Sequence, residues 1–389
     1  MTGVQTCALP ICKLTGQTDQ KPNDKRSIAI VNAYAGDMMG KVYVAKFFPE
    51  SCKKNVRSSI EEILYIMRES IKRNDWLSEP TKEKALIKLD KFFVKIGYPD
   101  CWKDYSEFDI IEGDSLYEIS KKAKQWAIKV EFFNKINSVI NKTEWLMTPQ
   151  TVNAYFMPTQ NEIVFPAAIL QPPFYCKSPE DIDFDYSDEI KMIEKIRPEC
   201  RVIGYDFTTA VNLGGIGAVI AHEITHGYDD NGRKFDGDGN LNDWWTETDT
   251  TLFNSKTTIM SEQAKKHKFI DPEDKKEYTM NPELTMGENL ADLGGVSLAL
   301  QTLTFKLKAS GFSDEEIKIN HRVLFKSFAN IWKENAKKDF LINQLTTDPH
   351  APVHFRGNLV KNMDEFYTAF DIKETDKMYI IPAKRVRMW

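Results

Sequence analysis

The stretch that decides the fold reads GAVIAHEITHGYDD and covers residues 217–230. It contains an HExxH motif that runs from His222 to His226. Residues four apart lie on one face of an α-helix, so both imidazoles can reach one metal ion while Glu223 sits beside it. Neutral imidazole nitrogens suit Zn²⁺, and an open zinc site adds a third protein ligand and a water molecule. We therefore expect a helix whose two histidines bind zinc and whose Glu223 acts as a base.

A short motif of this kind also arises by chance, and its ordinary interpretation is two core histidines with structural partners. The apolar run before the motif, residues 218–221, predicts a buried helix in which two unpaired histidines would be costly. The rest of the sequence therefore has to decide between the two interpretations.

A second helical segment, ENLADLGG, provides that context. Glu288 and Asp292 lie four residues apart and so share one helix face. A carboxylate from Glu288 would complete a His₂Glu zinc site, and Asp292 would accept the N–H of a ligand histidine and fix its tautomer. Both could instead be surface charges, but Gly294 and Gly295 follow at once and indicate close helix packing.

The composition of the 389-residue chain is that of an ordinary globular protein, with 42% hydrophobic and 28% charged residues. Its net charge of −5 and the alternation of basic with acidic residues argue against a nucleic-acid partner, which would need a basic stripe. No apolar run approaches the roughly 20 residues of a membrane-spanning helix, so we expect no membrane segment in this stretch. Of the six cysteines, Cys7 and Cys12 lie at the start of the chain, and the other four form no CxxC pair and are expected to be free buried thiols. They are Cys52, Cys101, Cys176 and Cys200.

The first third of the chain, residues 27–141, has a helical pattern. Apolar residues recur at helical spacing from Cys52 to Arg73. Thr81 is the expected N-cap of the next helix, and Gly97 followed by Pro99 is its expected end.

In the middle of the chain the helical pattern ends, and residues 151–165 contain short runs of residues that favour β-strands. An acidic segment, residues 178–189, is expected to be a solvated loop. Beyond it the pattern is helical again, with helices expected over 217–230 and 285–310 and a further one capped by Ser313. The sequence thus predicts a mainly α fold with a small β-sheet, an α+β protein.

The two helical motifs belong to a series of short sequence blocks that runs to the end of the chain. In order they are VNAYF (152–156), IVFP (163–166), QPPF (171–174), HEITHGYDDNGR (222–233), DWW (243–245), GENLADLGG (287–295) and the closing RMW (387–389). Together, from about Asp37 to Trp389, they resemble the neprilysin family of zinc metallopeptidases. The resemblance implies a thermolysin-like HExxH catalytic lobe with one Zn²⁺ per chain. Val386 stands where extracellular animal members have a cysteine, so the chain is similar to the bacterial-type endopeptidases.

The resemblance also implies roles for residues that spacing alone does not single out. Asn153 and Ala154 would bind the peptide backbone, and Arg356 would grip the substrate carbonyl. His350 would stabilise the tetrahedral intermediate and would be held by Asp348. Two further sets complete the implied site: Asp229 as a supporting carboxylate, and Ile169, Phe174, Val219 and Trp332 as the apolar pocket for the side chain after the scissile bond.

The chemistry of these groups agrees with the implied roles. Zinc lowers the pKa of bound water towards about 7, and Glu223 can take its proton and pass it to the leaving amine. His350 and Arg356 can donate to the oxyanion. We therefore expect a zinc metalloendopeptidase that hydrolyses oligopeptides on the amino side of hydrophobic residues.

Two other functions remain open at this stage. One is an HExxH aminopeptidase, which would need an acidic motif for the substrate amine; none is evident near the edge strand. The other is a non-catalytic peptide-binding protein built on a peptidase scaffold.

The ends and divisions of the chain carry expectations of their own. Residues 1–11 (MTGVQTCALPI) match the translation of a common sequencing adapter, so residues 1–12 are interpreted as an artefact. Residues 13–142 are expected to link to a cap lobe, and 143–389 to form the catalytic domain. Members of the family are nearly twice this length, which implies that the cap lobe is largely missing here. The resemblance further suggests a secreted, periplasmic or membrane-anchored protein with an external catalytic domain.

Overall fold

The computed structural model describes residues 16, 19–271 and 273–389, so the segment 1–12 interpreted as an artefact lies outside the described residues. The longer helices are α2 (Asn23–Phe47), α3 (Glu50–Arg73), α4 (Glu79–Asp90), α5 (Leu116–Glu131), α6 (Ser187–Ile196), α9 (Ala218–His226), α10 (Glu247–Lys265), α11 (Met286–Ala309), α12 (Asp314–Ile331) and α13 (Lys338–Thr347). The shorter ones are α7 (Cys200–Ile203), α8 (Thr208–Asn212), α14 (Val353–Gly357) and α15 (Asp364–Phe370). The strands are β1 (Phe93–Gly97), β2 (Tyr155–Met157), β3 (Glu162–Pro166), β4 (Lys268–Ile270) and β5 (Glu277–Thr279).

The larger sheet has three strands in the order β1-β3-β2. β1 runs parallel to β3 and β2 runs antiparallel to it, so that Ile163 lies opposite Val94 on one side and Phe156 on the other. A separate hairpin pairs β4 with β5. The expected fold class, mainly α with a small β component, is confirmed.

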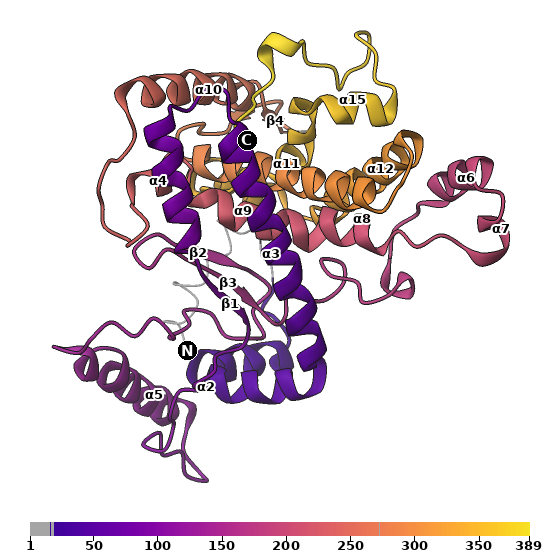
Figure 1. Cartoon of the computed structure of the whole chain (residues 1–389). Helices are drawn as coiled ribbons and strands as arrows, with labels where there is room; N and C mark the ends of the chain where they lie inside the picture. The colour runs from indigo at the N-terminus through magenta and orange to yellow at the C-terminus, as the bar shows by residue number, and fades with distance from the viewer. Residues whose placement is uncertain (1–15, 17–18, 272) are drawn as a thin grey trace.

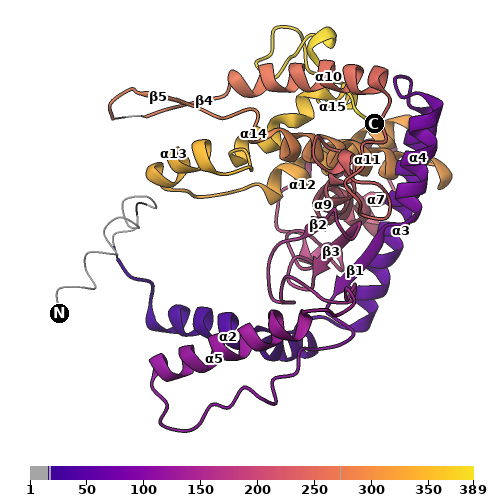
Figure 2. The same ribbon diagram turned by 90° about the vertical axis from the view of Figure 1, so that its left-hand side faces the viewer.

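The long helix α3 connects two parts of the molecule (Figure 1). Figure 2 shows α2 and α5 together on one side of the three-stranded sheet and the helices from α9 onward on the other. The predicted apolar stripe of α3 faces the core, where Ile60, Ile63, Met67 and Ile71 are all buried. The sheet and α3 thus form the support on which α9 and α11 pack.

The segment around α4 differs from the expectation in two ways. Ser78 rather than Thr81 precedes the helix, which begins at Glu79. The Thr81 hydroxyl lies inside the first turn and donates to the buried carboxylate of Asp249 at 2.6 Å. The helix ends at Asp90, because the next apolar residues pair with β3 as strand β1. A partner distant in sequence therefore decides both boundaries.

The acidic segment is irregular only as far as Tyr186, apart from one short 3₁₀ turn. α6 begins at Ser187, and Glu189 is fully buried rather than solvated. The prediction of a solvated loop is therefore wrong for the end of this segment, where two cations on α12 bind the carboxylate.

The predicted helices at the metal motif and beyond form with small changes. The first is shorter than expected, since α9 ends at His226 and a π-helical turn (Leu213–Gly217) precedes it. Ser313 caps α12 as predicted, with its side chain and that of Glu316 each bonded to the other's backbone N–H.

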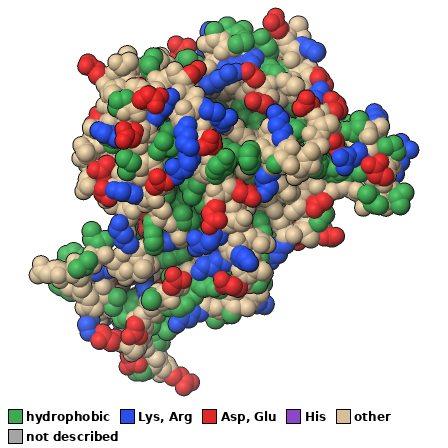
Figure 3. Space-filling view, viewed as in Figure 1, with side chains coloured by type: hydrophobic (Ala, Val, Ile, Leu, Met, Phe, Trp, Pro, Cys, Tyr) green, Lys and Arg blue, Asp and Glu red, His purple; other side chains and the backbone are tan. Residues whose placement is uncertain are grey.

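The surface and the thiols complete the description. The four cysteines are free, but Cys101 is exposed, whereas the other three are buried as predicted. On the face shown in Figure 3, basic and acidic side chains are interspersed rather than gathered by sign. Among the described residues, no helix combines the length and the apolar character needed to cross a bilayer.

Candidate metal centre

Three predicted ligands converge from two helices. His222 and His226 come from α9 and Glu288 from the first turn of α11, and their ligand atoms all lie within 4.8 Å of one another. The two Nε2 atoms are 2.9 Å apart, and the Glu288 oxygens lie 3.3 Å from the first and 3.6 Å from the second. Zinc bonds of about 2.0–2.2 Å in tetrahedral geometry place ligand atoms roughly 3.3–3.6 Å apart, which the two Glu288 distances match and the distance between the two Nε2 atoms falls short of. The three residues are therefore spaced to share one ion.

Hydrogen bonds on the far side of each ring decide which nitrogen faces this point. Asp292 Oδ1 lies 2.8 Å from His222 Nδ1, and Asp229 Oδ2 lies 2.6 Å from His226 Nδ1. Each neutral ring therefore carries its hydrogen on Nδ1 and points the Nε2 lone pair at the other ring. When both rings are neutral, two lone pairs at 2.9 Å and a Glu288 oxygen that accepts no hydrogen bond converge on one point, and a metal ion or a proton on His222 would stabilise this arrangement. The donor set thus fits a zinc ion.

The electrostatics of the cluster point the same way. Burial lowers the pKa of His222, but the hydrogen bonds and charges of Asp292 and Glu288 outweigh it and raise that pKa to about 10. Burial would raise the pKa of Glu288, but the two histidines hold it well below its usual range. A site that stabilises positive charge on imidazole this strongly also favours a divalent cation.

Glu223 lies on α9 next to the first ligand and is 5% exposed. Burial raises the pKa of its carboxyl, and the neighbouring histidines only partly offset this. A carboxylate with raised pKa binds a proton more readily than an ordinary glutamate, as a general base at neutral pH requires.

Close contact between α9 and α11 brings the ligands together. A Cβ atom on Gly295 would lie 2.6 Å from the Ala218 carbonyl oxygen, and one on Gly294 would lie 2.5 Å from Thr225 Oγ1. The prediction that these glycines mark close packing is confirmed. Any larger residue there would push α11, and with it Glu288, away from the two histidines.

Asp292 has a second partner besides His222. Its carboxylate accepts from Arg356 Nε at 2.6 Å and from Arg356 Nη2 at 2.8 Å. Arg356, on α14, is itself buried, and its guanidinium lies 3.9 Å from the centre of the Trp332 ring. One carboxylate therefore orients both a predicted metal ligand, His222, and the arginine predicted to bind substrate.

His350 lies at the rim of the same cluster, in the loop after α13. Its Nδ1 is 2.9 Å from Asp348 Oδ1, and its Nε2 is 3.3 Å from Glu288 Oε2. Its side chain is 45% exposed. The histidine is thus oriented by the predicted aspartate and remains accessible.

A cavity of about 580 Å³ opens beside the ligands and is lined by every predicted site residue except Asp348. Asn153 and Ala154 directly precede β2, which is an edge strand of the sheet. Both residues line the cavity. The predicted apolar residues Ile169, Phe174, Val219 and Trp332 all line it.

Sequence reasoning missed part of the cavity wall. Phe328 and Ile331 also line it, one turn before and immediately before Trp332. Their spacing at the end of α12 places all three on one side of the helix, a signal that was available in the sequence. Phe156 on β2 is a further missed member.

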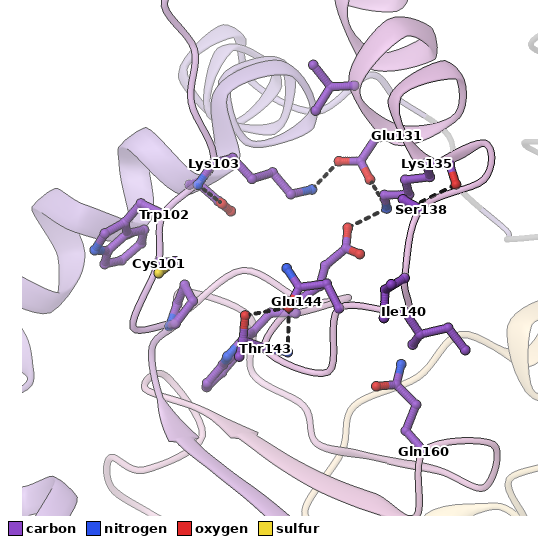
Figure 4. A pocket seen from close by; sticks show the side chains of 16 residues that line it. Cys101, Trp102, Lys103, Glu131, Lys135, Ser138, Ile140, Thr143, Glu144 and Gln160 are labelled. Carbon is purple, nitrogen blue, oxygen red and sulfur yellow. Dashed lines mark hydrogen bonds and ion pairs between the residues drawn. The ribbon is translucent and has the colours of Figure 1, made fainter.

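A second cavity, of about 460 Å³, lies away from this cluster beside α5. Figure 4 shows that its charged side chains form an alternating series, in which Lys103 contacts Glu131 and Lys135 bridges Glu131 and Glu144. Across the part of the chain that the structure describes, only the His222 cluster brings three potential metal ligands together. The cavity that contains this cluster is therefore the candidate functional site.

Comparison with known proteins gives matches along most of the chain. Two family models, both described as peptidase family M13, match residues 10–99 and residues 153–186 with 204–386. The neutral endopeptidase of Lactococcus lactis subsp. lactis (strain IL1403) is 33% identical over 378 residues, which are 97% of this chain and 53% of the relative. Neprilysin-1 of Caenorhabditis elegans is 31% identical over 390 residues, 97% of this chain and 47% of the relative.

Solved structures give the same result. The zinc metalloprotease Zmp1 of Mycobacterium tuberculosis, in complex with an inhibitor, superimposes with a TM-score of 0.82 at 36% identity. PepO from Lactobacillus rhamnosis HN001 gives a TM-score of 0.81 at 30% identity. Each comparison covers 97% of this chain and 53% of the solved one. The chain spans about half the length of the relatives it matches.

Proposed function

The chain belongs to peptidase family M13, and we propose on this premise that it is a zinc-dependent endopeptidase acting on oligopeptides. One observation carries the proposal above all others. Two imidazole lone pairs and a carboxylate without a hydrogen-bond donor converge on one point, beside a buried glutamate and an open cavity. We further propose residues 143–389 as the catalytic domain and 13–142 as the link to a cap lobe, as the length of the relatives suggests.

In the proposed reaction, zinc held by His222, His226 and Glu288 would supply an acidified water molecule and polarise the substrate carbonyl. Glu223 accepts the proton of the attacking water and delivers it to the leaving amine. Burial raises the pKa of Glu223, which favours its protonated form and so suits it to accept this proton.

Two side chains are suited to stabilise the negative charge that develops on the carbonyl oxygen. Arg356 is fixed by two hydrogen bonds to Asp292, and His350 is fixed by Asp348. Donors that are already oriented need little reorganisation during the reaction, which is the main source of their effect. The edge of β2 at Asn153 and Ala154 can bind the substrate backbone as an added strand.

The apolar lining supports cleavage on the amino side of hydrophobic residues. Ile169, Phe174, Val219, Phe328 and Trp332 all line the cavity, and the rings of Phe328 and Trp332 pack edge to face. An apolar side chain that follows the scissile bond would gain about 25 cal/mol for each Å² of surface removed from water.

An aminopeptidase is less well supported, because it would need a free carboxylate to bind the substrate amine. Asp229 is occupied by His226 and by the backbone amides of Asn231 and Gly232. Asp292 is occupied by His222 and Arg356. The two aspartates of the cavity are thus already paired with its histidines and arginine.

The test is to express the chain, measure its zinc content, and follow cleavage of a short quenched fluorescent peptide with and without a chelator. We expect one zinc per chain, and cleavage that the chelator abolishes. Glu223→Gln should retain zinc and lose activity by about 10²–10⁴-fold. The exposed Glu283, changed to Gln, serves as the matched control.

Each other outcome has a clear meaning. Absence of bound zinc would overturn the central proposal. Stoichiometric zinc without cleavage, unchanged in Glu223→Gln, would favour a non-catalytic peptide-binding protein.

A further inference from the structure

The helices α6 and α7 form an insertion that the family match does not include. The match ends at residue 186 and resumes at residue 204, so residues 187–203 lie outside it. Figure 1 shows these two helices projecting from the body of the molecule beyond α8 and α12, and Figure 3 shows the same projection carrying charged and apolar side chains. We name residues 187–203 the α6–α7 insertion.

The insertion is attached to α12 by a buried ion-pair cluster. Glu189 is fully buried, and both of its oxygens are engaged. Oε1 accepts from Arg322 Nε at 3.0 Å and Oε2 from Lys326 Nζ at 2.6 Å, so the two cations come from successive turns of α12. Such a buried, charge-assisted arrangement is stable only in a narrow range of geometries, and it therefore fixes position more than it adds stability.

Other contacts extend this attachment from the first turn of α12 to the last. Three polar contacts join the insertion and its flanks to this helix: Arg197 with Glu316, Tyr205 with Asn320, and Asp183 with Asn330. The last of these, at 3.0 Å, lies directly before the residues that line the cavity. The insertion, through Glu189 and Arg197, and its flanks, through Asp183 and Tyr205, thus contact α12 from its first turn to its last.

The opposite side of the same helix end forms a wall of the cavity. Phe328, Ile331 and Trp332 line the cavity there. At 3.6 residues per turn, Lys326 and Asn330 point roughly away from this wall. Trp332 also packs against the guanidinium of Arg356. A shift of α12 would therefore move both the apolar wall and the arginine.

We propose that the α6–α7 insertion, through Glu189, sets the position of the cavity wall at the end of α12 and so selects the size of the apolar side chain that the cavity accepts. Glu189 is then a positioning residue, since it touches neither substrate nor metal. The inference rests on the proposed function of the cavity as a peptide-binding site.

The test measures binding rather than turnover, so that it is independent of catalysis. Two peptides that differ only in having Phe or Ala after the scissile bond are titrated calorimetrically into the full zinc-loaded chain carrying Glu223→Gln. We expect the Phe peptide to bind more tightly. Adding Glu189→Gln should reduce that preference about tenfold, the value of roughly one methylene in an apolar pocket, and leave the Ala peptide within about twofold.

Matched variants separate positioning from general damage. Asp188→Asn changes the neighbouring, exposed acid on α6 and should leave the preference unchanged. Lys326→Met removes one cation while Arg322 still pairs with Glu189, so it carries the test if Glu189→Gln fails to fold. Lys326→Arg retains the charge and should retain the preference.

The outcomes discriminate between the two proposals. An equal loss of affinity for both peptides, or no loss in a folded Glu189→Gln variant, would overturn the inference. The inference would also be overturned if the chain carrying Glu223→Gln alone bound the two peptides equally, or bound neither of them. Failure of the unmodified chain to cleave any peptide would instead overturn the proposed function and leave the binding result to decide the role of the insertion.

Discussion

Replacing Asp292 with asparagine should weaken zinc binding and destabilise the fold at once. The side chain is 2% exposed, and its carboxylate accepts three hydrogen bonds, one from His222 and two from Arg356. Asparagine has nearly the same shape, but its Nδ2 is a donor. In Asp292→Asn one of the buried donors must therefore face another donor.

The size of each effect follows from these contacts. Loss of the partner that orients a ligand histidine reduces metal affinity by about 10–100-fold, or roughly 1.4–2.7 kcal/mol. Arg356 is 8% exposed and would lose its charged partner. Breaking a buried ion pair from one side costs about 3–5 kcal/mol, and the hydrogen bond that asparagine can still accept places the expected loss towards the lower value.

Zinc affinity would be measured by competition with a chelator whose absorbance reports bound metal, and stability by urea unfolding of the zinc-free protein. Asp348→Asn is the matched control, because it changes an aspartate that orients His350 and contacts no ligand. A folded Asp292→Asn protein that binds zinc within twofold of the parent would refute the assignment of His222 orientation to this carboxylate.

Three further predictions concern other parts of the molecule. Burial lowers the pKa of Lys88 from 10.5 to about 7, so the unfolded chain holds a proton that the folded chain releases between these values. The free energy of unfolding of the parent, measured in urea relative to that of Lys88→Met, should therefore rise across that pH window by up to roughly 5 kcal/mol. Parallel pH profiles of the two proteins would contradict this. Gly295→Ala should lower zinc affinity and destabilise the fold by about 1–3 kcal/mol, because its Cβ meets the Ala218 carbonyl; unchanged affinity would show that the helices separate freely. Asp348→Asn should lower kcat by up to about 10²-fold with KM little changed, as His350 loses its orientation, and a change in KM alone would argue against that role.

Local patterns predicted the parts of the fold that depend on neighbours in the chain. The spacing of Ile60, Ile63 and Met67 predicted the buried face of α3, because a helix repeats every 3.6 residues whatever it packs against. Ser313 was predictable as a cap for the same reason, since its partner Glu316 lies three residues away.

Features that depend on distant partners were missed. The residues of β1 read as the end of a helix, but they pair with β3 almost seventy residues later. Thr81 has the chemistry of an N-cap, yet its hydroxyl is bound by Asp249. Glu189 lies in an acidic segment whose composition is typical of a solvated loop. Its carboxylate is nevertheless buried and pairs with two cations more than a hundred residues away.

The sequence by itself determined which side chains could hold the metal and accept the proton, because His222, Glu223 and His226 share a helix face through local periodicity alone. Only the tertiary structure decided that Glu288, Asp292 and Arg356 meet them, since this requires α11 and α14 to pack against α9. The tertiary structure also decided that Glu189 packs against α12, where Arg322 and Lys326 bind its carboxylate. Such contacts close over long stretches of chain, and their geometry is set by the packing of helices rather than by the spacing of residues.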